Sequence, residues 1–469
     1  MKYEYDLITI GLGPAGMAVS IMGAEMGLRV CAIEKHKLGG ECMNVGCIPS
    51  KSLLRMGKAR HVFAKLGEME LSGAEEPQVL KPFEKIQGYL KYINEAKTVS
   101  MFDKVDLILA EGEAGFVDAN TVQVGERKVT AKRIFIAVGT RPAIPPIKGI
   151  DKIDVVTNEN MFHLEEVPKS MVIIGGGAIG TEMAQAFSRL GTEVSLIHMD
   201  KHLVPGADQE SGDLLEQTFS EEGIKVYNGK GVESVEEKDG IITLKSTDGD
   251  ILQGEKLLVA AGRKPDFTSL KLERAGIRTT EKGFIKVNNY LQTTTPNIYG
   301  VGDCNGHFLL SHAAMHQGMI AIMNSMMFWP MKRNFKKYVV PWTVFTDPQI
   351  SHVGMTEKQL QEKGEKYEVI KMNYGDYGAA IAENVTKGFL KAYVSKTGKI
   401  YGALIVGEGS GEMINEWGLA IQNKLRMHNI MFLQHSFPTM GFLTKRSSEV
   451  WMMNRMKSPF LKKMCKVMF

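Results

Sequence analysis

The stretch YDLITIGLGPAGMAVSIMGAEMGLRVCAIE, residues 5–34, determines the fold class. It opens with a short apolar run typical of a buried strand and continues through Gly11, Gly13 and Gly16 in the spacing G-x-G-x-x-G. A helix-like segment follows, and a second strand-like run ends on Glu34. In this order the glycines let the backbone approach a pyrophosphate at a helix N-terminus, and the acid binds the ribose hydroxyls. The stretch therefore predicts a dinucleotide-binding unit.

The same design recurs in SMVIIGGGAIGTEMAQAFSRLGTEVSLIH, residues 170–198. Gly175, Gly177 and Gly180 have the same spacing, again between a strand-like and a helix-like run. Because each such unit binds one dinucleotide, the repeat predicts two of them.

The second unit differs from the first at the end of its second strand, where His198 replaces the acid. An acid at this place favours the free 2′-hydroxyl of NADH, whereas basic side chains suit a 2′-phosphate. His198, with Lys201 and His202 close behind, therefore favours NADPH, and NADH stays open.

Two of the five cysteines, Cys42 and Cys47, lie in GGECMNVGCIPSK, residues 39–51. They can be zinc ligands, a structural bridge or a redox pair. A zinc site needs about four ligands, and the sequence shows no second cysteine pair. A bridge over so short a loop stabilises little. Pro49 predicts a helix that starts just after Cys47, and a helix N-terminus favours a reactive thiolate.

Composition limits the class of protein. With 469 residues and 44% hydrophobic content, the chain is expected to form two to four domains. Its net charge of +4 is too small to indicate nucleic-acid binding. We see no signal peptide and no apolar run of the ~18 residues that a membrane span needs. The odd number of cysteines does not fit a secreted disulfide scaffold, so we expect a cytoplasmic enzyme.

With the cysteine motif added to the first dinucleotide unit, the chain resembles the FAD-dependent pyridine nucleotide–disulfide oxidoreductases. Dihydrolipoamide dehydrogenase, glutathione reductase and mercuric reductase belong to this family. The resemblance covers essentially the whole chain. Further segments that carry it are RIFIAVGTRP (133–142), LLVAAGRKPDF (257–267), TTTPNIYGVGDC (293–304), VPWTVFTDPQISHVGMTEKQL (340–360) and GALIVGEGSGEMINEWGLAI (402–421).

The resemblance implies an α/β protein with two Rossmann-like dinucleotide-binding domains and an α+β C-terminal dimerisation domain, assembled as a homodimer. The FAD-binding domain would comprise residues 1–150 and 272–339. The NAD(P)-binding domain would be inserted at 151–271, and the dimerisation domain would take 340–469.

The resemblance also implies the site. Cys42 and Cys47 would form a redox-active disulfide, with Cys47 next to the flavin and Cys42 exchanging with the acceptor. Lys51 would lie near the flavin's reactive nitrogen and pair with Glu182. Electrons would then pass from NADPH or NADH through FAD to the disulfide. Further cofactor-binding positions that the family pattern implies are Ala114, Gly139, Gly262, Asp303, which would hold the ribityl chain, and Ser311.

One departure from the family pattern bears on the electron acceptor. Relatives that act on lipoamide or glutathione carry a His-Pro…Glu pair, supplied by the partner subunit, as acid–base for the outer thiol. The matching segment here is QHSFPTMGFL, residues 434–443, with Phe437 and Phe442 at those positions. Because phenylalanine transfers no proton, we expect another acceptor, such as a quinone or a metal ion. The alternatives are a disulfide reductase with a substitute base such as His435, and a non-catalytic flavoprotein subunit.

The C-terminal tail, MMNRMKSPFLKKMCKVMF, residues 452–469, has five Lys/Arg and no acid. If it is helical from Phe460, then Phe460, Leu461, Met464 and Met468 share a face. Such a helix can lie on an anionic bilayer, at the inner face of the membrane, or pack across the dimer.

Overall fold

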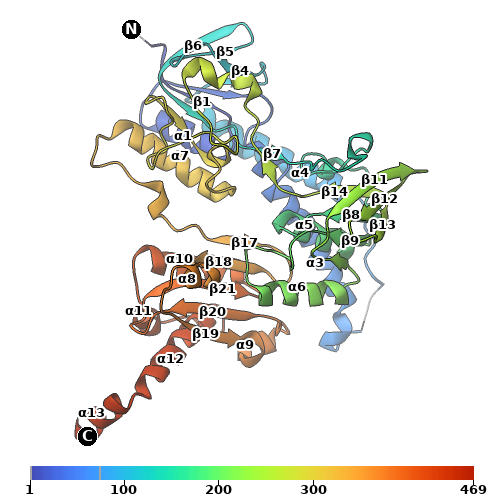
Figure 1. Ribbon diagram of the computed structural model, residues 1–469, viewed down its shortest axis with the longest axis vertical. Coiled ribbons are helices and arrows are strands. Elements are labelled where there is room, and N and C mark those ends of the chain that lie inside the picture. The colour runs from blue at the N-terminus through green and yellow to red at the C-terminus, as the bar shows by residue number, and fades with distance from the viewer. Residues whose placement is uncertain (1–2, 73–74, 469) are drawn as a thin grey trace.

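The computed structural model describes residues 3–72 and 75–468 and has three parts (Figure 1). The part at the top of Figure 1 contains the N-terminal sheet, the part at the right contains the sheet around β8 and β9, and the part at the bottom contains the C-terminal sheet. The expected fold class, two Rossmann-like units followed by an α+β domain, is confirmed.

The N-terminal sheet, within the described residues, has seven strands in the order β3-β2-β1-β6-β5-β4, with β16 beside β6. Strand β1 pairs in parallel with β2 and with β6. Strand β16 also pairs in parallel with β6, although it comes far later in the chain. This pairing supports the predicted division of the FAD-binding domain, whose boundaries stay a prediction. The strands are β1 (Tyr5–Ile10), β2 (Val30–Glu34), β3 (Asp106–Leu109), β4 (Ala114–Phe116), β5 (Thr121–Val124), β6 (Arg127–Ile136) and β16 (Ile298–Gly300), and the helices are α1 (Pro14–Glu25), α2 (Gly40–Asn44), α3 (Cys47–Ala64), α4 (Pro82–Ile93) and α7 (Ser311–Met326).

The second part repeats the strand–glycines–helix–strand pattern. Its parallel sheet runs β10-β9-β8-β14, and an antiparallel sheet, β11-β12-β13, lies beside it. A short β7-β15 ribbon connects it to the first part. The elements are β7 (Arg141–Pro142), β8 (Ser170–Ile174), α5 (Ala178–Arg189), β9 (Glu193–Ile197), α6 (Gln209–Glu221), β10 (Lys225–Tyr227), β11 (Val232–Lys238), β12 (Ile241–Ser246), β13 (Ile251–Gly254), β14 (Lys256–Val259) and β15 (Arg263–Lys264).

The third part is an antiparallel sheet, β17-β18-β21-β20-β19, packed against helices around the buried Trp417. Its elements are β17 (Trp342–Val344), β18 (Ile350–Gly354), α8 (Glu357–Glu362), β19 (Glu368–Asn373), α9 (Gly378–Ala382), β20 (Phe389–Val394), β21 (Ile400–Val406), α10 (Ser410–Gln422), α11 (Met427–Phe432), α12 (Phe442–Met456) and α13 (Pro459–Met468).

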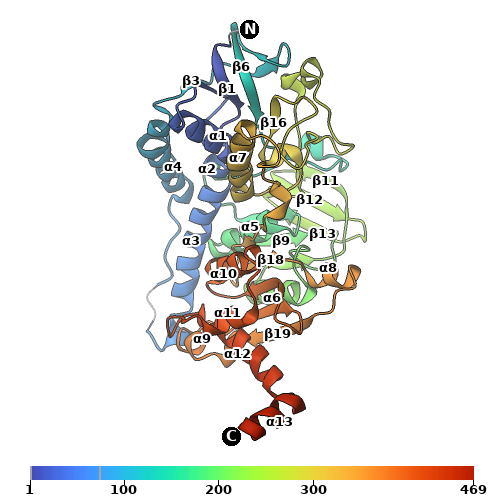
Figure 2. The same ribbon diagram turned by 90° about the vertical axis from the view of Figure 1, so that its left-hand side faces the viewer.

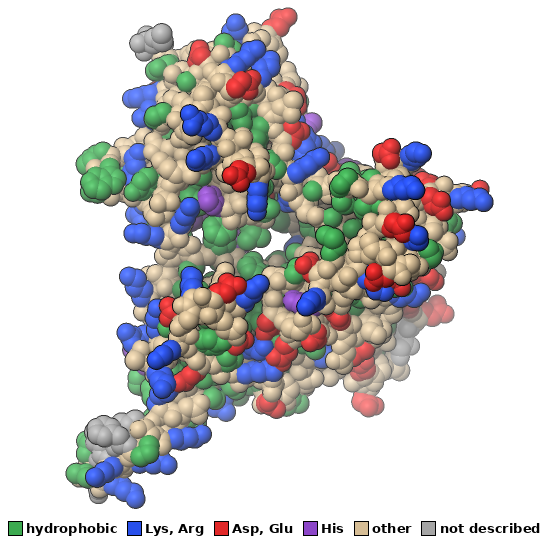
Figure 3. Space-filling view, viewed as in Figure 1, with side chains coloured by type: hydrophobic (Ala, Val, Ile, Leu, Met, Phe, Trp, Pro, Cys, Tyr) green, Lys and Arg blue, Asp and Glu red, His purple; other side chains and the backbone are tan. Residues whose placement is uncertain are grey.

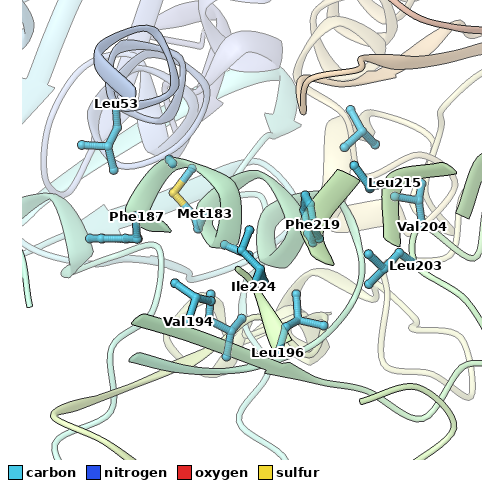
Figure 4. Packing of buried hydrophobic residues seen from close by; sticks show 14 of the residues in the cluster. Leu53, Met183, Phe187, Val194, Leu196, Leu203, Val204, Leu215, Phe219 and Ile224 are labelled. Carbon is cyan, nitrogen blue, oxygen red and sulfur yellow. The ribbon is translucent and has the colours of Figure 1, made fainter. Parts of the chain in front are cut away.

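A hydrophobic core joins α3 of the first part to α5 of the second. Figure 4 shows Leu53 of α3 next to Met183 and Phe187 of α5, with Val194 and Leu196 of β9 beneath. All five side chains are buried. Because α3 begins at Cys47 and α5 carries Glu182, this core fixes the two elements that bring the expected catalytic side chains together.

The C-terminal tail forms an arm that projects from the third part at the lower left of Figure 1. Helix α12 ends at Met456 and α13 begins at Pro459, so the tail is helical from Phe460, as the shared apolar face requires. The side chains of Phe460, Leu461 and Met464, three of the four expected on its apolar face, lie outside the described residues, whereas Met468 is exposed. Among the helices in the described ranges, we find none with the length and hydropathy to cross a membrane.

Candidate active site

In the first glycine loop, neighbouring backbone atoms occupy the space that a side chain on Gly11 or Gly16 would need. Gly11, just after β1, has φ +89°, and a Cβ on Gly16 would lie 1.9 Å from the Gly11 carbonyl oxygen. At the end of β2, the Glu34 carboxylate accepts hydrogen bonds from the Leu12 N–H at 2.8 Å and the His36 N–H at 2.9 Å. A helix N-terminus, a glycine cradle and a carboxylate thus stand together, as a dinucleotide requires.

The second glycine loop has the same geometry, because a Cβ on Gly180 would lie 1.8 Å from the Gly175 carbonyl oxygen. His198 lies beside this loop, but its ring is buried and its Nε2 is 2.5 Å from Asn228 Oδ1. Its other nitrogen lies 3.9 Å from the Asp200 carboxylate. A 2′-phosphate contact through His198 therefore stays a prediction, and the structure turns this ring inwards.

A cavity of about 1530 Å³ runs from the first glycine loop to the third part. It brings together most of the predicted site. The predicted residues that line it are Gly11, Gly13, Glu34, Cys42, Cys47, Lys51, Ala114, Gly139, Glu182, Asp303 and Ser311. Predicted residues outside its lining are Gly16, Gly175, Gly177, Gly180, His198 and Gly262. Of those six, Gly16, Gly175 and Gly180 are packed closely against backbone, whereas a Cβ on Gly177 or Gly262 would meet nothing within 4 Å.

Both cysteines of the motif lie at this cavity, close enough for each thiol to influence the pKa of the other. Cys42 lies on the short helix α2, and Cys47 is the first residue of α3, so this helix begins at Cys47 rather than just after it. The contact between the thiols raises the pKa of Cys42 and holds the pKa of Cys47 below its ordinary value. Ser311 Oγ, 3.3 Å from Cys47 Sγ, and the charge of Lys51 lower the pKa of Cys47 further. The inner sulfur is therefore the one that the site holds as a thiolate.

Replacing Ser311 with alanine is expected to raise the pH at which the Cys47 thiolate forms, by about one unit, because a hydrogen bond to a charged group contributes ~1.5–3 kcal/mol. In the two-electron-reduced enzyme, the thiolate–flavin charge-transfer absorbance should be present at neutral pH and fade on acidification. The fading should be centred below the ordinary thiol pKa, and Ser311→Ala should shift it upwards. A titration that is the same in both proteins would contradict this role. Ser325→Ala, on the same helix but away from the cysteines, is the matched control.

Lys51 and Glu182 form the ion pair that the resemblance implied. Lys51 Nζ is 2.7 Å from Glu182 Oε2, and only 5% of the Glu182 side chain is exposed. The other carboxylate oxygen accepts a hydrogen bond from the Phe345 N–H at 3.0 Å. The ammonium also lies over the Phe345 ring, 4.5 Å from its centroid.

Helix α5 is tied to the third part at further points, which sets the position of Glu182. Gln185 Nε2 donates to the Asp347 carbonyl at 2.8 Å. Arg189 bridges Glu222, at 2.6 Å, and the Asp347 carboxylate, at 3.0 Å. Glu182, Gln185 and Arg189 recur at helical spacing, so one face of α5 is fixed against residues 345–347.

Arg263 and Glu41 form an ion pair in the cavity that the sequence did not reveal. Arg263 also donates to Thr140 Oγ1 at 2.7 Å and lies 3.9 Å from Asp303. Burial raises the pKa of Asp303 to about 6, with Arg263 acting in the opposite direction. Each residue belongs to a motif that the sequence analysis quoted, since Glu41 precedes Cys42 and Arg263 follows Gly262. Nothing in either motif indicates that these two side chains form an ion pair.

The segment after α11 carries an aromatic cluster. Phe437 and Phe442 have ring centroids 5.3 Å apart, and the Phe442 ring lies parallel to Tyr377 at 6.4 Å. Phe437 is 71% exposed. His435 is turned away into the protein, where Nε2 lies 3.0 Å from Glu416 and Nδ1 lies 3.3 Å from the Leu433 carbonyl oxygen. Burial raises the pKa of Glu416, although His435 opposes this.

Known families and proteins are similar to this chain over most of its length. Residues 5–318 match the family Pyridine nucleotide-disulphide oxidoreductase, and residues 340–446 match its dimerisation domain. A mercuric reductase of Bacillus cereus is 34% identical over 446 residues, which is 94% of this chain and 70% of that protein. A dihydrolipoyl dehydrogenase of Geobacillus stearothermophilus is 32% identical over 461 residues, covering 95% of this chain and 96% of that protein.

Among solved structures, the Cu(II) complex of the HOCl-induced flavoprotein disulfide reductase RclA from Escherichia coli superposes with a TM-score of 0.86. RclA is 27% identical to this chain in sequence, and the superposition covers 96% of this chain and 100% of the RclA chain.

Proposed function

Because the chain belongs to the pyridine nucleotide–disulphide oxidoreductase family, we propose that it passes electrons from NAD(P)H through FAD to the Cys42–Cys47 pair and on to an acceptor other than lipoamide or glutathione. Family members are FAD-dependent oxidoreductases that take electrons from NAD(P)H, and the dimerisation-domain match supports a homodimer. The observation that supports the proposal is the contrast between the dithiol site in the cavity and the aromatic cluster of Phe437 and Phe442, at the positions where the family resemblance implies an acid–base pair.

The residues of the cavity fit FAD. The glycine cradle at Gly11 and Gly16 would hold the pyrophosphate, Glu34 the ribose and Asp303 the ribityl chain. When bound, FAD supplies the two-electron relay between a nicotinamide and a disulfide. Within the chain, Lys51 brings a positive charge to the cavity, and Glu182 fixes the direction in which that ammonium points.

The two sulfurs have different roles in this proposal. Cys47, held as a thiolate by Ser311 and Lys51, stays at the cofactor. Cys42 keeps its proton, and as the outer sulfur it would meet the acceptor. The family resemblance implies that a histidine of the partner subunit would move the proton of this outer thiol. Phe437 and Phe442 cannot do so, and they present an apolar surface instead.

A substitute base at His435 is disfavoured by its contacts. Both ring nitrogens already have partners, Glu416 and the Leu433 carbonyl, so neither is free for a thiol. A general base typically contributes about 10²–10⁴-fold, so exchange with lipoamide or glutathione should be slow by that factor. A non-catalytic flavoprotein subunit is also disfavoured, because the cysteines and the Lys51–Glu182 pair are in place.

We infer that a flat apolar oxidant such as a quinone is the acceptor, since the exposed aromatic cluster favours a flat apolar ligand, and the two protons that a quinone takes up with its two electrons can come from solvent. A thiol-binding metal ion is the second candidate. It is favoured by relatives named mercuric reductase and by the Cu(II) complex of RclA. With either acceptor, the aromatic residues would replace the family's proton-transfer pair.

Steady-state assays with NADH and with NADPH test the proposal against a ubiquinone analogue, Hg²⁺, Cu²⁺, lipoamide and oxidised glutathione. The expected result is turnover with the quinone or a metal ion and at least about 10²-fold lower kcat/KM with lipoamide and glutathione. Lipoamide turnover at the highest rate of the set would overturn it. The same assays decide between NADPH and NADH.

We propose that the tail contacts an anionic membrane surface and places the enzyme on the inner face of the membrane. Lys462, Lys463 and Lys466 are exposed, and Val467 and Met468 are 81% and 72% exposed. Figure 3 shows basic and hydrophobic side chains together on the projecting arm. Flotation with anionic vesicles should be stronger for the full chain than for a chain lacking residues 458–469. Equal flotation would remove this part of the proposal and leave the electron transfer untouched.

A further inference from the structure

The connection between α7 and β17 exposes a set of apolar side chains, which we call the aromatic loop (residues 326–333). Phe328 is 69% exposed, Trp329 73%, Met331 53% and Met326 49%. Single exposed apolar residues are ordinary on a protein surface, but two adjacent aromatics flanked by methionines form a patch that is costly to leave in water.

The base of the aromatic loop is fixed by a buried amide. The Asn324 side chain is fully buried, donates to the Arg333 carbonyl at 2.9 Å and accepts from the Arg333 N–H at 2.7 Å. It also donates to the Tyr290 carbonyl at 3.3 Å. Just beyond, the Phe335 ring is buried. Because the loop is tied down at both ends, the outward direction of Phe328 and Trp329 is a property of the fold.

Basic side chains follow the apolar tip in the chain. Lys332, Arg333, Lys336 and Lys337 follow it, and the sequence has no acidic residue between Asp303 and Asp347. Arg333, Lys336 and Lys337 are exposed. Tryptophan and phenylalanine favour the boundary between headgroups and acyl chains, and each nearby lysine or arginine is attracted to anionic lipid. The charge of the loop thus complements an anionic bilayer surface.

The aromatic loop and the C-terminal arm lie on the same side of the molecule. In Figure 1 both project to the left, and in Figure 2 this side, with α7 and the α12–α13 arm, faces the viewer. Figure 3 shows hydrophobic side chains at the left edge of the upper part and basic ones along the arm. Both elements carry lysine and arginine and no acid, so both favour the same anionic surface.

We propose that residues 326–337 form a membrane-docking element that inserts Phe328 and Trp329 among the headgroups of an anionic bilayer. This inference extends the membrane contact proposed for the tail, but it rests on residues of its own. A bilayer is also where a lipid-soluble quinone dissolves, so docking would bring the reductase to that acceptor.

Tryptophan fluorescence reports this contact directly. Of the four tryptophans, Trp417 and Trp451 are buried and Trp342 is half-buried, so Trp329 alone is strongly exposed to solvent. Phosphatidylserine vesicles should shift the emission to shorter wavelength, and brominated phosphatidylserine should quench it. Phosphatidylcholine vesicles should do neither. Trp329→Phe should lose the signal while the protein still sediments with the vesicles.

The matched variant Phe328→Ser/Trp329→Ser should lower the partition into phosphatidylserine vesicles at least about tenfold, with or without residues 458–469. It should leave the rate with soluble ferricyanide unchanged, since the loop lies outside the cavity.

An unchanged partition of this variant into the vesicles, or no emission shift in the wild type, would overturn the inference. So would a variant that becomes monomeric in gel filtration, because the loop would then be a protomer interface. Loss of binding on tail deletion alone, with the loop variant behaving as wild type, would leave the tail proposal standing and reject this one.

Discussion

Replacing Cys42 with serine is expected to lower turnover with a thiol-dependent acceptor by about 10³-fold or more, as for the loss of a reacting nucleophile. The same replacement should leave the inner sulfur as a thiolate, because the hydroxyl of the new serine can donate to Cys47 as the Cys42 thiol does, and Ser311 and Lys51 still lie beside Cys47. The oxidised Cys42→Ser enzyme should therefore show charge-transfer absorbance without any reductant, whereas Cys47→Ser should show none. Absorption spectra of the two variants measure this before any turnover.

How much turnover Cys42→Ser loses depends on the electron acceptor. A metal ion held by both sulfurs should be reduced no better than the background rate in Cys42→Ser. A quinone that takes electrons directly from the cofactor should be reduced at nearly the wild-type rate. Cys465→Ser, at an exposed thiol on the projecting arm, is the matched control and should change neither the spectrum nor turnover. If Cys42→Ser keeps full activity with every acceptor, the dithiol has no part in the reaction.

The sequence predicted the parts of the site that depend on local spacing. The glycine loop, Glu34 and the two cysteines each lie within one short strand–helix unit, where spacing alone sets position. It also located Asp303 and the Lys51–Glu182 pair, although these needed the family resemblance, because Lys51 and Glu182 are 131 residues apart.

What the sequence did not reveal are contacts between elements that only the fold brings together. Arg263 meets Glu41 across 222 residues, and no periodicity or motif predicts that distance in the chain. Likewise, the basic character of His198 favoured a phosphate contact, but its ring packs inwards against Asn228. The charge of a side chain can be predicted from sequence, whereas the direction in which the side chain points is set by its packing neighbours.

Replacing Lys51 with methionine is expected to slow reduction of the enzyme by NAD(P)H by about 10²–10³-fold, because a positioned charge in a low-dielectric site is lost. The variant should also lose about 1–3 kcal/mol of stability, since the buried Glu182 carboxylate would lose its cation and keep only the Phe345 N–H. The loss of stability is expected to be this small because 35% of the Lys51 side chain is exposed, so solvent screens its attraction to Glu182. Stopped-flow reduction and denaturant unfolding measure the two effects separately.

A double replacement separates the electrostatic role from the structural one. In Lys51→Met/Glu182→Gln the buried charge is gone, and the amide oxygen of the new side chain can still accept the Phe345 N–H, so most of the stability should return. The rate of reduction should not return, because no cation faces the cofactor. If the double variant regains the rate together with the stability, Lys51 acts only by holding α3 against α5. If Lys51→Arg/Glu182→Gln reduces at the wild-type rate, the charge alone is sufficient, and the role proposed for Glu182 in orienting it is wrong.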